Sequence, residues 1–278
     1  MARHPLTVVA AGPAARPYLE CDALPGVRIP GQLIGIGENY WPDTAEGFPD
    51  TSGSDTPGSE TPGSDTSGSN TPGSETPGSA GGTAPNRRAV GRIPLVFGKF
   101  PGSLAGDGQP IVLDPALTGT VVCEGELAVV VGRVLKDAHS ASEALQAVAG
   151  VTVANDVSAR DLQQADVQST RGKSLDTFCP LGPELVTLDE LPDLQSLGIL
   201  TRINGAVVQE SSTANMVFSV AELLMFCSRF MTLYPGDVIL TGTPFAADES
   251  VLELRPGCTV SVEIGGVGTL ANPVVARV

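Results

Sequence analysis

The run Val121-Val-Cys-Glu-Gly-Glu-Leu-Ala-Val-Val-Val-Gly132 carries two acidic residues inside an otherwise apolar stretch. Its valines and its terminal glycine are typical of a largely buried strand. Side chains two residues apart on a strand point to the same face, so Glu124 and Glu126 are expected to project together. Two carboxylates on one face of a buried strand repel each other, and they need protons, basic partners or a cation to neutralise them.

A third carboxylate, Asp156, ends the apolar run Gly150-Val-Thr-Val-Ala-Asn-Asp156. If Asp156 meets Glu124 and Glu126, the three form an all-oxygen site, which suits Mg²⁺ or Mn²⁺ better than Zn²⁺. The alternative is that both glutamates face solvent on an edge strand. The Glu-x-Glu spacing by itself leaves these two interpretations open.

The composition excludes several classes of protein. The chain has 278 residues, enough for one large domain or two small ones. Its net charge of −15 argues against nucleic acid or an anionic membrane as a partner. The five cysteines form no Cys-x-x-Cys pair, so neither a disulfide framework nor a zinc knuckle is indicated. No signal peptide is recognisable and no apolar run approaches the roughly 20 residues that span a bilayer, so we expect a cytoplasmic protein.

A low-complexity segment interrupts the chain at residues 51–85. A pentapeptide of the type Ser-Asp-Thr-Pro-Gly starts at Ser54 and recurs every five residues to Ser74. With almost nothing apolar to bury, the segment is expected to be a disordered surface insertion, and a role as a modified segment or a spacer stays open. It separates an N-terminal part with a lid segment (1–50) from the main domain (86–278).

The rest of the chain is dominated by short strand-like segments separated by turns. Together with 33 glycines, this pattern predicts a β-rich α+β fold with a barrel-like or rolled sheet. Only two or three helices are predicted, over about 141–149, 158–168 and 219–230. Asn204-Gly205 predicts a hairpin turn. The segment 171–183, dense in Gly and Pro, and the stretch that begins at Lys99 are predicted to be loops.

Several polar residues outside the acidic trio have both a functional and an ordinary interpretation. Lys173, in a Gly-flanked loop, could hold an anionic substrate or stabilise an enolate, or it could be a surface lysine. Arg160 and Gln163 share one helix face and could point with Asp156 into a pocket, or could merely solvate the helix. Thr243, in a Thr-Gly-Thr turn, could help to bind a carboxylate. The absence of a Gly-x-Ser-x-Gly motif argues against a Ser-His-Asp hydrolase.

Taken in order, these motifs resemble those of the fumarylacetoacetate hydrolase family. The resemblance runs from about residue 32 to the C-terminus, except for the insertion. The matching stretches are Gly35-Ile-Gly-Glu-Asn-Tyr40, Glu124–Gly132, Asn155-Asp-Val-Ser-Ala-Arg-Asp161, Lys173–Pro183, Ile203-Asn-Gly205 with Gln209, and Tyr234–Pro244.

The resemblance implies a rolled mixed β-sheet with a smaller N-terminal part, usually in a homodimer. It implies Mg²⁺, Mn²⁺ or Ca²⁺ bound by Glu124, Glu126 and Asp156. It also implies a substrate pocket lined by three polar side chains and a threonine that binds the substrate carboxylate. These residues are Arg160, Gln163, Lys173 and Thr243, and we assign Lys99 to substrate binding with them. The implied substrates are small anionic 1,3-dicarbonyl or 2-oxo acids, which the family hydrolyses at a C–C bond, decarboxylates or isomerises.

Two departures from the family pattern bear on the reaction. In related hydrolases a His and a Glu on the loop after Asn-Tyr activate a water. Here Glu46 fits the Glu position, but Asp43 stands where the His is expected. After Pro244, Phe245-Ala-Ala-Asp-Glu249 replaces the usual Gly-rich continuation. The leading hypothesis is C–C hydrolysis with Lys173, Glu46, Asp43 and Gln163 as catalytic residues. The alternatives are a decarboxylase or enol–keto isomerase, which needs no attacking water, and a non-catalytic relative.

Overall fold

The computed structural model describes residues 3–9, 18–41, 93–166, 168–246 and 248–278. The predicted insertion (51–85) and the lid residues Asp43 and Glu46 lie outside these ranges, so the predictions made for them remain predictions. No helix in the described ranges is long and apolar enough to cross a membrane.

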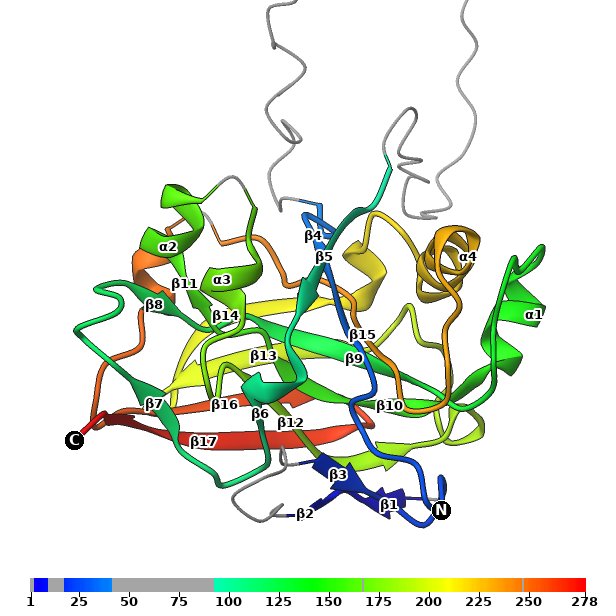
Figure 1. Cartoon of the computed structure of the whole chain (residues 1–278), viewed down its shortest axis with the longest axis horizontal. Coiled ribbons are helices and arrows are strands. Elements are labelled where there is room, and N and C mark those ends of the chain that lie inside the picture. The colour runs from blue at the N-terminus through cyan, green and yellow to red at the C-terminus, as the bar shows by residue number, and fades with distance from the viewer. Residues whose placement is uncertain (1–2, 10–17, 42–92, 167, 247) are drawn as a thin grey trace, which may run out of the picture.

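The fold is a sheet-rich α+β arrangement built around two larger sheets (Figure 1). The first sheet has the order β1-β12-β10-β9-β15-β4-β5, with β6 paired to β12, and the second has the order β14-β13-β16-β17-β7. The strands of the first are β1 (Arg3–Pro5), β12 (Cys179–Val186), β10 (Val148–Asn155), β9 (Gly125–Val131), β15 (Val238–Leu240), β4 (Leu33–Gly37), β5 (Leu95–Lys99) and β6 (Leu104–Ala105). Those of the second are β14 (Ala206–Ser212), β13 (Gly198–Ile203), β16 (Thr259–Ile264), β17 (Gly268–Ala276) and β7 (Ile111–Leu113).

Both sheets are open within the described residues, so the rolled sheet is confirmed while a closed barrel is not formed there. Two small pairs complete the β structure: β8 (Val121–Val122) with β11 (Ser158–Ala159), and β2 (Thr7–Val9) with β3 (Tyr18–Glu20). Strands β1 and β4 of the N-terminal part pair with β12 and β15 of the main domain. Strands β1 and β4 therefore share a sheet with β9, which carries Glu126, and with β10, which ends one residue before Asp156.

Strand β9 is buried along its whole length, as its valine-rich sequence predicts. On one face, Leu127 and Val129 join a core formed with β13, β16 and helix α4 (Val220–Phe230). On the other face, Ala128 and Val130 join a second core, formed with β12, β15 and the N-terminal strands. Because both faces are covered by apolar side chains, the position of β9 is tightly constrained.

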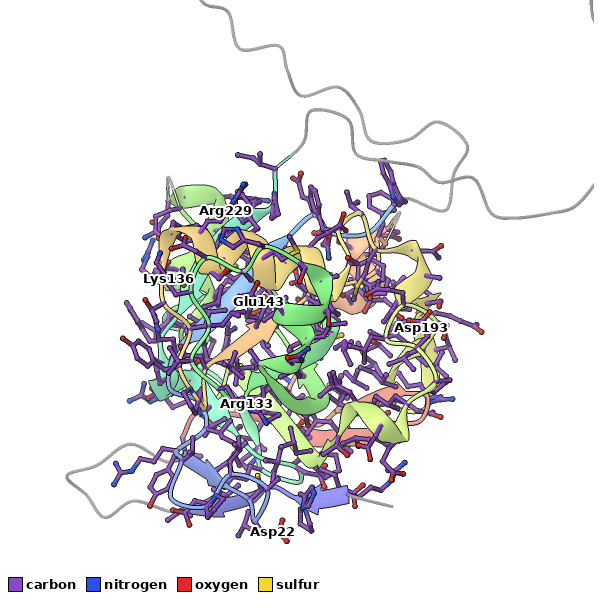
Figure 2. All side chains as sticks on the ribbon, turned by 90° about the vertical axis from the view of Figure 1, so that its right-hand side faces the viewer. Asp22, Arg133, Lys136, Glu143, Asp193 and Arg229 are labelled. Carbon is purple, nitrogen blue, oxygen red and sulfur yellow. The ribbon has the colours of Figure 1, made fainter. Side chains whose placement is uncertain are left out.

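The predicted long helix and hairpin are confirmed. Helix α4 begins with a capping box in which Ser219 and Glu222 satisfy each other's backbone N–H groups. Asn204 and Gly205 join β13 to β14 with φ angles of 51° and 83°, the left-handed values that favour Asn-Gly in a two-residue turn. Helix α1 (Ala141–Gln146) lies beside α4 at one end of the molecule, the end that Figure 2 views face on.

Other details of the predicted secondary structure are wrong. The predicted loop 171–183 contains the end of helix α3 (Thr170–Lys173) and most of β12. Pro180 has no backbone N–H to donate to a neighbouring strand. Strand β12 nevertheless pairs with β10, through an irregular register, and with β6 in parallel. Helix α1 stops at Gln146, since Val148 already starts β10. Lys99 ends β5, and the described residues hold four α-helices, the remaining one being α2 (Arg160–Ala165).

Candidate active site

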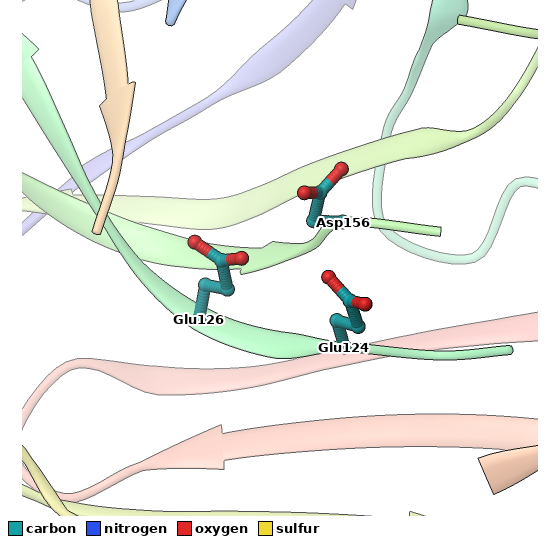
Figure 3. A group of neighbouring side chains, drawn as sticks. All are labelled: Glu124, Glu126 and Asp156. Carbon is teal, nitrogen blue, oxygen red and sulfur yellow. The ribbon is translucent and has the colours of Figure 1, made fainter. Parts of the chain in front are cut away.

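Glu124, Glu126 and Asp156 meet in one buried cluster, as the sequence predicted. One ligand oxygen from each lies within 4.8 Å of the others. Figure 3 shows Glu124 and Glu126 rising on the same side of one chain segment, with Asp156 beside them. The register explains this meeting. Gly125 pairs with Asn155 across β9 and β10, and the backbone N–H of Asp156 donates to the carbonyl of Glu124 at 2.8 Å.

The residue between the two glutamates has to be glycine. A β-carbon on Gly125 would lie 2.3 Å from Oγ1 of Thr201 on β13 and 2.9 Å from Val262 on β16. Real β-carbons essentially never approach so closely. The second sheet therefore presses directly against the backbone that carries the two carboxylates.

Three cationic side chains surround the acidic cluster. The Lys173 ammonium lies 2.6 Å from Glu124 Oε2 and 2.5 Å from Asp156 Oδ2. Arg160 Nη2 lies 2.7 Å from Glu124 Oε1, and Lys99 Nζ lies 2.5 Å from Asp156 Oδ1. Burial opposes ionisation of Asp156, but Lys173 and Lys99 outweigh it and hold the pKa of this carboxyl below its ordinary value. Glu124 and Asp156 are therefore each paired on both oxygens.

Glu126 is different, because no ion pair is recorded for it within the described residues. It accepts one hydrogen bond, from the backbone N–H of Gly242 at 2.6 Å. Burial and the negative charge of Asp156 raise the pKa of Glu126 well above its ordinary value, and Lys173 offsets this only in part. The hydroxyl of Tyr40 is also buried and has no hydrogen-bond partner in the described part of the chain. Burial, followed by the charge of Glu126, raises the pKa of that hydroxyl too.

This arrangement fits a divalent cation. The donor set consists only of carboxylate oxygens, the type of ligand that hard cations such as Mg²⁺ and Mn²⁺ prefer. Glu126 is a buried carboxylate that lacks a cationic partner among the described residues, and its charged form is costly without one. Glu124, Glu126 and Asp156 can therefore hold a divalent cation, which would relieve the unpaired charge of Glu126.

The cluster opens into a cleft of about 420 Å³. Glu124 and Glu126 reach this cleft from the start of β9 and Lys173 reaches it from the end of α3, and Arg160, Gln163 and Thr243 line it as well. The remaining wall is largely apolar. Its apolar side chains are Ile36, Tyr40, Leu95, Phe97, Pro244, Phe245, Ala246 and Leu252. The structure thus brings together six of the residues predicted for the site, and Asp156 lies directly beneath them.

Lys99 requires a correction. Its side chain is completely buried and it is not among the residues that line the cleft. Besides Asp156, the Lys99 ammonium donates to the carbonyl oxygens of Val157 at 3.3 Å and Phe178 at 2.8 Å. A residue held in this way cannot reach a substrate, so we reassign Lys99 from substrate binding to positioning Asp156.

Replacing Lys99 by Met is expected to lower the free energy of unfolding by about 3–5 kcal/mol, because removing one partner of a buried ion pair leaves the other uncompensated. Urea denaturation measures this loss. The control is Lys136→Met, since the Lys136 side chain is 43% exposed and its change should shift the unfolding free energy little. A substrate-binding role for Lys99 would instead raise KM with stability unchanged.

Some residues at the site were not assigned a role from the sequence. Tyr40 lies within the matched Asn-Tyr motif, which was the available signal for it. Gln209 was matched to the family without a role. It donates to Thr243 Oγ1 at 3.1 Å and to the carbonyl of Pro244 at 2.9 Å, and so fixes the turn that lines the cleft. Glu249, on the short 3₁₀ turn Glu249–Leu252, also lines the cleft. It ends the stretch that departs from the family pattern after Pro244, which was the available signal for it.

The site thus combines a buried trio of carboxylates, a rolled sheet and a cleft lined by a lysine, and comparison with known proteins shows the family to which such a chain belongs. The chain matches the family model described as fumarylacetoacetate (FAA) hydrolase C-terminal over residues 67–275. This protein belongs to the fumarylacetoacetate hydrolase family.

Relatives of known structure share the fold over nearly the whole chain. A crystal structure of 5-carboxymethyl-2-hydroxymuconate delta-isomerase from Mycobacterium smegmatis matches with a TM-score of 0.70 and 31% identity, covering 99% of both chains. Fumarylacetoacetate hydrolase from Exiguobacterium antarcticum matches with a TM-score of 0.72 and 28% identity, covering 99% of this chain and 100% of that one.

A human relative named oxaloacetate tautomerase FAHD2B, mitochondrial, is 45% identical over 192 residues. That match covers 67% of this chain and 60% of the relative, so the chain spans less than two thirds of the relative's length.

Proposed function

We propose that this protein is a divalent-cation-dependent enzyme that interconverts the enol and keto forms of a 2-oxo acid. The observation that carries the proposal is the Lys173 ammonium, which is fixed between Glu124 and Asp156 at the wall of the cleft. The family includes tautomerase and isomerase relatives, named above, which favours this reaction over the C–C hydrolysis expected from the sequence.

The chain's own residues supply the charge that the reaction needs. Enolisation of a 2-oxo acid places negative charge on the former keto oxygen, and a fixed ammonium at Lys173 Nζ stabilises charge that develops beside it. Burial disfavours the charged amine, but Asp156 and then Glu124 outweigh it and raise the pKa of Lys173, so the amine stays protonated. When bound by Glu124, Glu126 and Asp156, Mg²⁺ or Mn²⁺ would supply Lewis-acid stabilisation of the same charge.

Two further groups in the cleft bear on proton placement. The pKa of the Tyr40 hydroxyl is raised, so this group remains an O–H donor at neutral pH, and it has no hydrogen-bond partner among the residues that the structure describes. It can donate to a substrate oxygen from the cleft wall. Thr243, held by Gln209, presents a second hydroxyl that can orient a substrate carboxylate. The apolar wall limits the water that reaches the enol form.

The test follows the enol–keto interconversion of oxaloacetate and of phenylpyruvate by ultraviolet absorbance, with Mg²⁺ or Mn²⁺ and with EDTA. The expected result is cation-dependent acceleration of interconversion for at least one of the two acids, with no CO₂ released. Release of two acids from an acylpyruvate as the sole turnover would replace this proposal with C–C hydrolysis. Release of CO₂ as the sole turnover would make the protein a decarboxylase.

A further inference from the structure

The Arg160 guanidinium, at the cleft mouth, is already bound by carboxylates of the protein itself. Its Nε and Nη2 lie 3.0 and 2.9 Å from the two oxygens of Glu249, a bidentate pair. Nη2 also contacts Glu124 at 2.7 Å, and Nη1 donates to Gln163 Oε1 at 3.0 Å. These four contacts leave one of the five N–H groups of a guanidinium unassigned.

Glu249 pairs with the part of Arg160 that could otherwise bind a carboxylate of the substrate. The bidentate face of a guanidinium is the part that recognises a carboxylate on a ligand. Here the carboxylate of Glu249, the first residue of the 3₁₀ turn Glu249–Leu252, occupies that face. Both residues line the cleft, so the pair stands where the far end of a substrate would lie.

The net charge of the cleft also disfavours a substrate with a second carboxylate. The acidic residues that line it are Glu38, Glu124, Glu126 and Glu249, against the two bases Arg160 and Lys173. The buried Lys99–Asp156 pair beneath them adds no net charge. With four acids against two bases, the cleft has an excess of two negative charges, and a substrate with a second carboxylate meets more repulsion there than a monocarboxylate does.

The apolar wall of the cleft offers contacts of another kind. Phe97 and Leu95 from β5 and Leu252 from the 3₁₀ turn line the same cleft. The Phe97 ring lies against Lys173, with Nζ 5.1 Å from the ring centroid, so this wall begins directly beside the fixed ammonium. An aliphatic or aromatic end of a substrate can bury its surface there, whereas a carboxylate would be desolvated without a partner.

We infer that Glu249 is a specificity-determining residue: by occupying Arg160 it selects 2-oxo monocarboxylates with an apolar far end and disfavours 2-oxo dicarboxylates. The inference rests on the proposed function and names its substrate class. Oxaloacetate is itself a 2-oxo dicarboxylate, so the inference ranks it below a 2-oxo monocarboxylate for this chain.

The test compares two ligands of equal carbon number, 2-oxovalerate and 2-oxoglutarate, which differ in a terminal methyl against a terminal carboxylate. Their binding to the full chain with Mg²⁺ is measured by calorimetry, without turnover. Wild type should bind 2-oxovalerate more tightly. Glu249→Gln, and independently Glu249→Ala, should tighten 2-oxoglutarate binding about tenfold relative to 2-oxovalerate, since one nearby negative charge is removed.

The matched control is Glu20→Gln, which removes an equal charge at an exposed position on β3, in another sheet. It should leave the affinity ratio unchanged. Glu249 is exposed, so both variants should fold, and a thermal melt checks this. A wild type that prefers 2-oxoglutarate, or a ratio unmoved in both Glu249 variants, overturns the inference alone. A wild type that binds neither acid overturns both the inference and the proposed function.

Discussion

Replacing Glu126 by Gln is expected to weaken Mn²⁺ binding by at least about 100-fold, because one of three carboxylate ligands is lost. In EDTA the same variant should unfold at a higher free energy than wild type, by about 1–3 kcal/mol, because a buried carboxylate without a cationic partner is replaced by a neutral amide. The amide can still accept from Gly242 and can donate to a neighbouring carboxylate. Thermal and urea unfolding, each with EDTA and with saturating Mn²⁺, measure both effects.

The contrasting variant is Glu124→Gln. Glu124 is paired with both Lys173 and Arg160, so its neutralisation should lower the free energy of unfolding in EDTA by about 1–3 kcal/mol while also weakening Mn²⁺ binding. The opposite signs of the two variants in EDTA identify Glu126 as the carboxylate that needs the cation. The interpretation fails if Glu126→Gln is the less stable of the two in EDTA, or if it keeps the full Mn²⁺-dependent stabilisation.

Replacing Lys173 by Gln is expected to lower kcat for enol–keto interconversion by about 100- to 10,000-fold, because a fixed positive charge beside the developing negative charge is removed. KM should change much less. The free energy of unfolding should also fall, by about 3–5 kcal/mol without added metal, since two buried carboxylate oxygens lose their ammonium. Steady-state kinetics at saturating Mn²⁺ and urea denaturation in EDTA separate the two effects.

Lys136→Gln is the matched control for Lys173. The Lys136 ammonium donates to the carbonyl of Arg229 on the outer surface, at the end of the molecule viewed in Figure 2. It should leave both kcat and stability close to wild type. If Lys173→Gln retains wild-type kcat at saturating Mn²⁺, its ammonium serves only to stabilise the acidic cluster.

The acidic centre of the site could be predicted from the sequence because its residues belong to short, local sequence patterns. An apolar strand with Glu124 and Glu126 two residues apart, followed by a second apolar strand ending in Asp156, can bury these acids only if they meet or find partners. Spacing also placed Arg160 and Gln163 on one side of a short helix, where the structure joins them by a hydrogen bond. These relationships are short in sequence and follow directly from strand and helix periodicity.

Contacts between residues far apart in the sequence could not be predicted from such local patterns. Lys99 was assigned to substrate binding although no local pattern fixes where its side chain lies. Only the three-dimensional pairing with Asp156 and Phe178 revealed that it lies underneath. The contact between Arg160 and Glu249 spans 89 residues. The prediction of a loop over residues 171–183 failed for a different reason. Gly and Pro favour a loop locally, but β12 forms there because it pairs with the neighbouring strands β1 and β10.

Strand β9 lies between two apolar cores, and Gly125 packs directly against Thr201. This packing restricts which amino acids the acid-bearing segment can accept. Any side chain added at Gly125 would clash with Thr201 and Val262 of the second sheet, so substitutions at this position are disfavoured. The 3₁₀ turn that carries Glu249 has no such restriction, because the Glu249 side chain is 56% exposed. Descendants of this gene would therefore inherit the acidic centre intact and acquire new substrates through exchanges at that turn.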